Sequence, residues 1–258
     1  MTSLSSSRSD GSQAIHRAVS LLRAVARVGA ADCSLAELAR AENMPRSTAH
    51  RMLQCLIDEG LVARDAQGKG YGLGPLAHEL GLVPSPQAAE VERWRGLVAA
   101  VARRTSVTAY LLRRSGPDAV CLLKAEGSAV VRVVPVEVGQ RRSLGLGAGA
   151  IALLAEQEDA VVEEVVRRLA QQRHSRELVP GETGLWESVR HARKTGFALS
   201  QGRVANESFG MGCVIPQPPG GPQLAISIAA HNSLVSESSM ARWQNDLREE
   251  VGRVVSAG

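Results

Sequence analysis

The chain has 258 residues, of which 44% are hydrophobic, 22% charged and only 3% aromatic. This composition is ordinary for a globular protein and excludes a largely disordered chain. So few aromatic side chains also argue against binding of single-stranded nucleic acid by base stacking. The formal net charge of +4 is spread along the chain, so charge alone neither requires nor excludes a DNA partner.

The sequence lacks the signals of a secreted, membrane-bound or zinc-binding protein. The Ser-rich start, residues 1–10, has no apolar signal segment, and polar side chains interrupt every apolar run well short of the ~20 residues of a membrane span. The four cysteines lie far apart and form no C-x-x-C pair. We therefore expect a disordered arm over residues 1–10 in a cytoplasmic protein with mostly buried thiols, no metal site, no cofactor and no membrane contact.

Residues 11–75 are predicted to form a winged helix-turn-helix. Ser34 and Glu37 have the spacing of a capping box, Pro45 suits the first position of a helix, and Gly60 suits a helix end. Together with apolar periodicity, these signals predict three helices and a hairpin over residues 12–28, 34–43, 45–59, 61–64 and 71–73. On the first helix, which should end at Gly29, the apolar stripe consists of Ile15, Val19, Leu22, Val25 and Val28.

The third helix carries the residues that predict DNA binding. In a helix-turn-helix the second paired helix enters the major groove, with its N-terminal residues at the base edges. Arg46 and Arg51 suit phosphate or guanine, and hydroxyl groups suit phosphate oxygens. The predicted DNA-binding residues are Ser34, Arg46, Ser47, Thr48, His50, Arg51 and Gln54, with Arg64 and Lys69 on the wing. Two alternatives stay open: a merely solvated polar face, and a winged helix that binds protein.

A second domain is predicted over residues 88–258, after a linker helix over residues 76–87 and the break at Pro84-Ser-Pro86. Periodicity predicts helices over residues 88–104, 150–156, 159–171, 184–194 and 236–255. Strands are predicted over residues 108–113, 119–125, 130–138, 197–203, 211–215 and 223–230. This alternation indicates a sheet with flanking helices and leaves the strand order open.

Several motifs in order resemble the IclR family of bacterial regulators. In the first domain they are S-x-x-x-x-R-A-V-x-L-L from Ser12, L-A-E-L-A-R from Leu35, M-P-R-S-T-A-H-R-M-L from Met44 and Y-x-L-G from Tyr71. In the second they are V-x-V-G-Q-R-R-x-L-G-L-G-A-G-A-I-A-L-L-A from Val136, G-F-A-L-S-Q-G-R-V from Gly196 and L-A-I-S-I-A-A from Leu224. The resemblance covers nearly the whole chain.

The resemblance implies an α+β protein in which a GAF-like α/β effector-binding domain follows the winged helix-turn-helix. It implies a regulator, repressor or activator, that binds a palindromic operator in double-stranded DNA as a homodimer or homotetramer. Its effector would be a small molecule, such as an organic acid or another catabolic metabolite. By motif position, the effector-binding residues are Leu144, Gly147, Ala148, Gly149, Ser200, Gly210, Met211 and Ser227.

The chain departs from the commoner family pattern L-H-A-T-A-x-G-K in its Gly-rich loop. Gly145 stands where His is usual, Ile151 where Lys is usual, and Ala229 at a site that can carry Ser. The pocket is therefore expected to prefer a less polar ligand or to be degenerate. A further alternative is that the small residues of this loop only permit tight packing of a helix on a sheet.

No catalytic site is legible in the sequence, and we expect no enzyme activity. The G-x-G-x-x-A run at residues 147–152 matches a dinucleotide fingerprint formally, but no strand runs directly into it. The sequence holds neither a G-x-S-x-G elbow nor metal-ligand spacing around its histidines. The pair Arg141-Arg142 suits either an anionic ligand or a solvated surface, and Arg167-Arg168 suggests the wet face of a helix.

Three functions remain open from the residues. The first is a regulator that senses a small metabolite, the second is an enzyme whose winged helix serves assembly, and the third is a constitutive regulator with a vestigial pocket.

Overall fold

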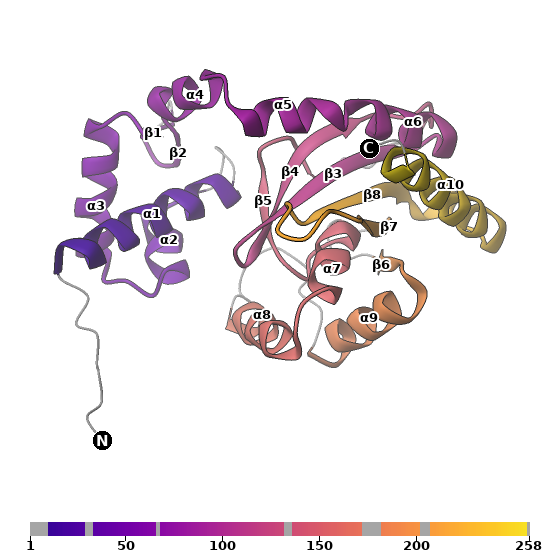
Figure 1. Cartoon of the computed structure of the whole chain (residues 1–258). Coiled ribbons are helices and arrows are strands. Elements are labelled where there is room, and N and C mark those ends of the chain that lie inside the picture. Colours follow the sequence, from indigo (N-terminus) through magenta and orange to yellow (C-terminus); the bar gives the residue numbers. More distant parts are fainter. Residues whose placement is uncertain are drawn as a thin grey trace. The chain divides into compact units, whose positions relative to one another are not determined.

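The computed structural model describes residues 10–28, 33–65, 68–131, 136–171, 182–201 and 207–256. The chain folds as two compact units, of which the first ends at Pro84 and the second begins at Ser85 (Figure 1). Residues 1–9 of the predicted arm lie outside the described part of the chain, as does Gly29. Asp10, predicted as the last residue of the arm, is instead the first residue of a helix.

The first unit is a winged helix-turn-helix. Its elements are α1 (Asp10–Val28), α2 (Leu35–Ala41), α3 (Arg46–Asp58) and the antiparallel strands β1 (Val62–Arg64) and β2 (Tyr71–Leu73). Leu21, Leu38 and Leu53, one from each helix, are almost fully buried in a common core. The stripe predicted on α1 is only partly buried, because Ile15 and Val19 are 66% and 41% exposed. This core holds α3 against the other two helices, whereas Ile15 and Val19 of α1 remain exposed to solvent.

Local sequence signals set the starts of α2 and α3. The Ser34 hydroxyl accepts a hydrogen bond from the Glu37 amide, and the Glu37 carboxylate accepts one from the Ser34 amide, so the capping box is present. Pro45 is the N-cap of α3 rather than its first residue. Its carbonyl already accepts the Ala49 amide, whereas its own backbone, with ψ of 137°, is still extended. The helix thus begins one residue later than predicted.

Two short helices lie around the predicted break between the domains. They are α4 (Pro75–Leu82) and α5 (Pro86–Arg93), and each begins with a proline at its first turn. Gly74 precedes α4 because no side chain fits there: a Cβ atom on Gly74 would lie 2.2 Å from the Gly60 carbonyl oxygen. Although α4 is rich in leucine, none of its residues is buried.

The second unit contains a six-stranded antiparallel sheet with helices on both faces (Figure 1). The strand order is β5-β4-β3-β8-β7-β6. The strands are β3 (Thr108–Ser115), β4 (Asp118–Ala125), β5 (Arg141–Ser143), β6 (Ala198–Gln201), β7 (Ser208–Ile215) and β8 (Leu224–His231). The central pair, β3 with β8, joins segments far apart in the sequence.

Each face of the sheet has its own hydrophobic core. The helices α6 (Arg95–Thr105) and α10 (Glu237–Ser256) cover one face, and α7 (Ala148–Ala155), α8 (Asp159–Gln171) and α9 (Glu182–Thr195) form the layer on the other. Because side chains alternate along a strand, Ala109 and Leu111 of β3 join the core under α6 and α10. Tyr110 and Leu112 join the core under α7. This alternation decides which strand residues can reach a ligand beside α7.

Two segments of the second unit differ from the sequence prediction. The helix expected over residues 88–104 is divided into α5 and α6 at Trp94, whose side chain is buried in the core. Residues 132–135 of the strand expected over 130–138 lie outside the described residues, and the rest of that range forms no strand; Val130 is 98% exposed. The short strand β5 pairs with β4 instead.

None of the helices in the described part of the chain combines the length and apolar character needed to cross a membrane. The four cysteines are free thiols. Burial raises the pKa of Cys33, Cys121 and Cys213 to about 12, so these three thiols stay protonated at neutral pH. Cys55, on α3, is exposed.

Candidate functional site

The outer face of α3 carries polar side chains that have few partners within the protein. Arg46, Ser47, His50 and Arg51 are exposed, and Thr48 is half-buried. Neither arginine forms a salt bridge or a hydrogen bond with the residues that the structure describes. Their guanidinium groups are therefore free to bind acceptors outside the chain.

Two other predicted contact residues are held by local hydrogen bonds. The Gln54 amide donates to the Asp58 carboxylate at 2.9 Å. The Ser34 amide and hydroxyl both donate to the same Glu37 carboxylate oxygen, at 3.0 and 2.7 Å. A phosphate oxygen needs a donor, and both donors of Ser34 are engaged. The structure thus gives Ser34 a capping role, which the sequence also indicated.

The wing is a tight turn with two basic residues. Both Asp65 carboxylate oxygens accept backbone amides, at 2.8 Å from Lys69 and 2.8 Å from Gly70, which shapes the turn. Arg64 donates to the Gly68 carbonyl at 3.1 Å and lies over the Tyr71 ring, 5.0 Å from its centroid. Lys69 is exposed. Local contacts therefore orient Arg64 and leave the Lys69 ammonium in solvent.

In the second unit, a cavity of about 50 Å³ lies between the start of α7 and the sheet. Its walls come from the loop before α7, from α7 itself and from strands β3, β5, β6, β7 and β8. The predicted effector-binding residues that line it are Gly147, Ala148, Gly149, Ser200, Gly210 and Ser227. The structure thus brings together residues that are widely separated in sequence.

Two predicted effector-binding residues do not reach this cavity. Gly210 faces α7, so its neighbour Met211 points to the opposite face of the sheet, where it is 0% exposed in the core under α6 and α10. Leu144 is also 0% exposed, within the hydrophobic core on the α7 side. Both side chains are packed among protein atoms.

Glycines allow α7 to lie directly on the sheet. A Cβ atom on Gly149 would lie 2.4 Å from the Cδ1 atom of Leu112 and 2.9 Å from the Ser227 hydroxyl. A Cβ atom on Gly212, which the sequence analysis did not select, would lie 2.8 Å from the Ser227 Cβ atom. At Gly149 and Gly212, therefore, the absence of a side chain permits tight packing of the helix on the sheet, which is one of the alternatives left open by the sequence. Gly147, with φ of 87°, adopts a backbone that glycine favours as it begins α7.

The cavity also has polar groups outside the predicted effector-binding set. Among the residues that the structure describes, Arg142 is the one charged residue of the lining, which favours the anionic-ligand alternative that the sequence left open for it. Tyr110 and Ser208, which the sequence did not indicate, line the cavity as well. The Tyr110 hydroxyl is buried and has no hydrogen-bond partner among the residues described. Burial, together with the nearby Cys121 and Glu137, raises the pKa of Tyr110 above its ordinary value despite the opposing effect of Arg142, so the hydroxyl stays protonated. A protonated, unpartnered hydroxyl in a cavity can donate to a ligand.

Comparison with known protein families decides which kind of protein carries these two sites. Residues 14–66 match the model of the IclR helix-turn-helix domain, and residues 91–256 match that of the bacterial transcriptional regulator IclR C-terminal domain. The chain belongs to the IclR family of bacterial transcriptional regulators. Its first unit is accordingly a DNA-binding helix-turn-helix, and its second is the ligand-binding domain of that family.

Individual IclR relatives are distant in sequence. The HTH-type transcriptional regulator BhcR of Paracoccus denitrificans is 26% identical over 253 residues, which covers 97% of this chain and 88% of the relative. The IclR transcriptional regulator of Alicyclobacillus acidocaldarius has a similar fold, with a TM-score of 0.67 and 21% identity over 95% of this chain and 98% of that chain. An IclR homologue of Microbacterium hydrocarbonoxydans, solved in complex with 4-hydroxybenzoate, has a TM-score of 0.61 and 20% identity over 95% and 100% of the two chains.

The IclR C-terminal domain of this chain also contains a buried ion cluster. The Asp118 carboxylate is 0% exposed and lies 3.6 Å from the Arg141 Nε atom and 3.8 Å from an Arg168 nitrogen. Arg141 also donates to the Ser115 hydroxyl at 2.9 Å. Arg168 therefore does not share the solvated face predicted for it, whereas the side chain of Arg167 is 64% exposed. Of the pair Arg141-Arg142, only Arg142 lines the cavity.

No group of three or more potential metal ligands occurs within residues 10–28, 33–65, 68–131, 136–171, 182–201 and 207–256. His231 has the kind of neighbours that a catalytic histidine has, because its ring nitrogens lie 2.8 Å from the Ser233 hydroxyl and 3.1 Å from the Glu207 carboxylate. His231 also accepts the Ser233 amide at 3.2 Å, so it caps the short turn after β8.

Proposed function

We propose that this IclR-family chain binds a palindromic operator in double-stranded DNA through α3 and the wing, and that a small anionic metabolite bound beside α7 changes its operator affinity. The observation that carries the DNA contact is the free cationic face of α3. Arg46 and Arg51 project from the second helix of a helix-turn-helix with no partner in the described part of the chain. In this fold that face meets base edges and phosphates in the major groove.

The proposed contacts differ in kind. Arg46 and Arg51 suit bidentate pairing with guanine or contact with phosphate, and Ser47, Thr48 and His50 add donors on the same face. Gln54 would exchange its bond to Asp58 for one to DNA. On the wing, Lys69 and Arg64 suit the phosphates of the neighbouring backbone. Ser34 contributes through the α2 cap and not as a donor to DNA.

Exposed apolar side chains in the first unit support a dimer of this chain. Leu80, Leu82 and Val83, at the end of α4 and just after it, are 57%, 67% and 60% exposed. On α1, Ile15 and Val19 are exposed as well. Exposed apolar side chains such as these suit an interface between two copies, and a second copy would also supply the second half-site reader that a palindrome needs.

Salt dependence tests the DNA contact. We expect the chain to bind a duplex from the region upstream of its own coding sequence, with log K falling linearly in log salt by about 0.9 for each phosphate contacted. The measurement is fluorescence anisotropy between low and physiological salt, with an unrelated duplex of the same length as control. An affinity for DNA that is indifferent to salt would contradict the proposal.

The chemistry of the cavity supports a small anionic effector. Within the described ranges, its lining has one charged residue, the cationic Arg142, and no acid. The Tyr110 hydroxyl and the hydroxyls of Ser200, Ser208 and Ser227 provide donors around an otherwise apolar wall. The Microbacterium homologue was solved with the anionic ligand 4-hydroxybenzoate, which agrees with this class.

The size of the cavity limits the effector and favours a second candidate function. Ligand sites usually enclose ~300 Å³ or more, whereas this cavity measures about 50 Å³. A metabolite therefore enters only if the loop before α7 moves away from the sheet. If it never does, the chain is a constitutive regulator with a vestigial pocket.

A ligand screen separates these two candidates. Small carboxylic acids should raise the unfolding temperature of the chain, because a ligand at 100 times its Kd adds about 2.7 kcal/mol to folding stability, and the matching uncharged amides should not. Arg142→Gln should remove the preference for the acid, and Arg190→Gln, an exposed arginine on α9, should leave it intact. Tyr110→Phe should weaken the ligand response without destabilising the free chain, because the deleted hydroxyl accepts or donates no hydrogen bond among the residues that the structure describes.

The same screen has two outcomes that contradict an anionic effector. Acids and amides that stabilise the wild type equally would point to an uncharged ligand. A panel in which no compound shifts the unfolding temperature would favour the constitutive regulator.

A further inference from the structure

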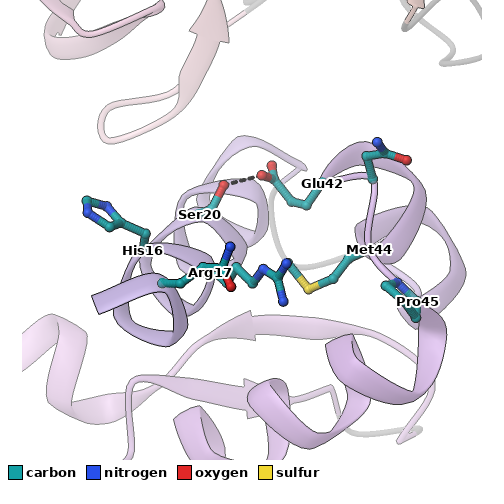
Figure 2. A pocket seen from close by; sticks show the side chains of 8 residues that line it. His16, Arg17, Ser20, Glu42, Met44 and Pro45 are labelled. Carbon is teal, nitrogen blue, oxygen red and sulfur yellow. Dashed lines mark hydrogen bonds between the residues drawn. The ribbon is translucent and has the colours of Figure 1, made fainter. Parts of the chain in front are cut away.

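A cleft of about 230 Å³ opens in the first unit between α1 and the turn that joins α2 to α3. Its lining residues are Gln13, His16, Arg17 and Ser20 of α1 with Glu42, Asn43, Met44 and Pro45 of the turn. Figure 2 shows Arg17 extending from α1 toward Met44, while Glu42 reaches back to Ser20. None of these residues belongs to the predicted DNA-binding set, although Arg17 lies in one of the family-like motifs.

The charge left free in this cleft is positive. Glu42 is the only acid among the described residues that line it, and its carboxylate accepts hydrogen bonds from the Ser20 hydroxyl and from Arg27, the latter at 3.3 Å. The side chains of Arg27 and Glu42 are only 16% and 12% exposed, so this acid is neutralised within the protein. Arg17 is exposed and has no ion pair or hydrogen bond with any part of the chain that the structure describes.

The hydrogen bonds that Glu42 accepts from α1 also hold the turn in place. They connect α1 to a segment in which Asn43 has φ of 47° and the Met44 amide donates to the Ala39 carbonyl at 2.8 Å. Because the cleft wall is fixed in this way, Arg17 is presented at a defined distance from the start of α3. The conformation of the turn does not require the Arg17 side chain.

The cleft lies where a phosphate backbone would pass. Met44 and Pro45 line it and immediately precede Arg46, the first residue of α3. A helix with its side chains is about 10–12 Å across, and the major groove is about 12 Å wide, so the groove walls run directly beside an inserted helix. Those walls are rows of phosphates. A cationic cleft next to the N-terminus of α3 therefore faces one of them.

We propose that this cleft receives a backbone phosphate of the operator and that Arg17 is its cationic contact, so that the DNA interface extends from α3 onto α1. This inference rests on the proposed function and adds an element and a residue to it. A phosphate contact positions the protein without reading sequence. Arg17 therefore contributes equally to operator and non-operator DNA, in contrast to Arg46 and Arg51.

The test is the salt dependence of DNA binding by the full chain carrying Arg17→Ala. The slope of log K against log salt should fall by about 0.9 for each chain bound, or about 1.8 for a dimer. The affinity for operator and for an unrelated duplex should drop by the same factor, which leaves the specificity ratio unchanged. Arg17→Lys keeps the charge and should keep the slope.

The matched control is Arg23→Ala, which removes the same charge from an exposed position of the same helix outside the cleft. The assignment is overturned if Arg17→Ala keeps the wild-type slope, or if Arg23→Ala lowers the slope as much. It is also overturned if inorganic phosphate stabilises the wild type but not Arg17→Ala while their DNA slopes agree, because the cleft then binds a free anion. Wild-type protein that binds no duplex would overturn the proposed function, and this assignment with it.

Discussion

Replacing Arg46 and Arg51 together by alanine is expected to abolish operator-specific binding and to leave the fold intact. Both side chains are exposed and unpaired, so their removal breaks no described contact within the protein. A bidentate arginine–guanine pair contributes about 1–3 kcal/mol of discrimination, and a dimer on a palindrome would lose four such contacts. That loss is as large as the whole specific advantage of a typical regulator, about 4–10 kcal/mol.

The measurement is competition between operator and unrelated duplex at fixed salt, with the unfolding temperature as a check on the fold. The control is the double variant Arg23→Ala/Arg190→Ala, which removes two exposed arginines from positions outside α3. It should keep the specificity ratio. Arg46→Lys and Arg51→Lys refine the result, because lysine keeps the charge but loses bidentate geometry. Unchanged specificity in the alanine double variant would move base recognition away from α3.

The first unit was predictable because its signals are local. The capping box at Ser34, the proline before α3, and the glycine after it each act within a few residues of the position that they define. The exception is α1, in which Ile15 and Val19 have the spacing of a buried helix face but are exposed to solvent. A single helix can carry two apolar faces, one for its own core and one for another surface, and periodicity does not tell them apart.

The second unit was less predictable because its strand order and its pocket depend on contacts distant in sequence. Nothing near Tyr110 in the sequence indicates that β3 pairs with β8, or that the Tyr110 hydroxyl then lies under α7. The direction of the Met211 side chain could have been expected from the sequence. From Phe209 to Gly212 large apolar residues alternate with glycines, which already places Gly210 and Met211 on opposite faces of a strand.

Val130 and Val131, which form no strand, show another limit of local reasoning. β-Branched residues favour strands, but a strand also needs a partner with free hydrogen-bonding groups. The Cys121 amide and carbonyl of β4 bond to Gln140 and Gly139 instead, at 3.0 and 2.8 Å. The pairing of β4 therefore continues into Arg141–Ser143.

The burial of Asp118 likewise depends on residues distant in sequence, and its removal is expected to have a large effect on stability. It follows a Gly-Pro turn, where an aspartate usually faces solvent, yet it is 0% exposed between Arg141 and Arg168. Asp118→Ala should destabilise the second unit by about 3–5 kcal/mol, because it leaves two guanidinium groups without the buried carboxylate that neutralises them. Urea unfolding, followed by circular dichroism, measures this as a lower midpoint.

Two further variants show whether burial of the carboxylate causes the expected loss of stability in Asp118→Ala. Asp159→Ala removes an ion pair with Arg193 at 2.8 Å, but there the side chains are 68% and 35% exposed, so the cost should stay below about 1 kcal/mol. Replacing the whole cluster, as in Asp118→Leu/Arg141→Met/Arg168→Met, should recover most of the stability lost in Asp118→Ala, because no buried charge is then left unpaired. Equal losses in Asp118→Ala and Asp159→Ala would mean that water reaches Asp118. A triple variant less stable than Asp118→Ala would mean that the cluster stabilises the fold beyond neutralising its own charges.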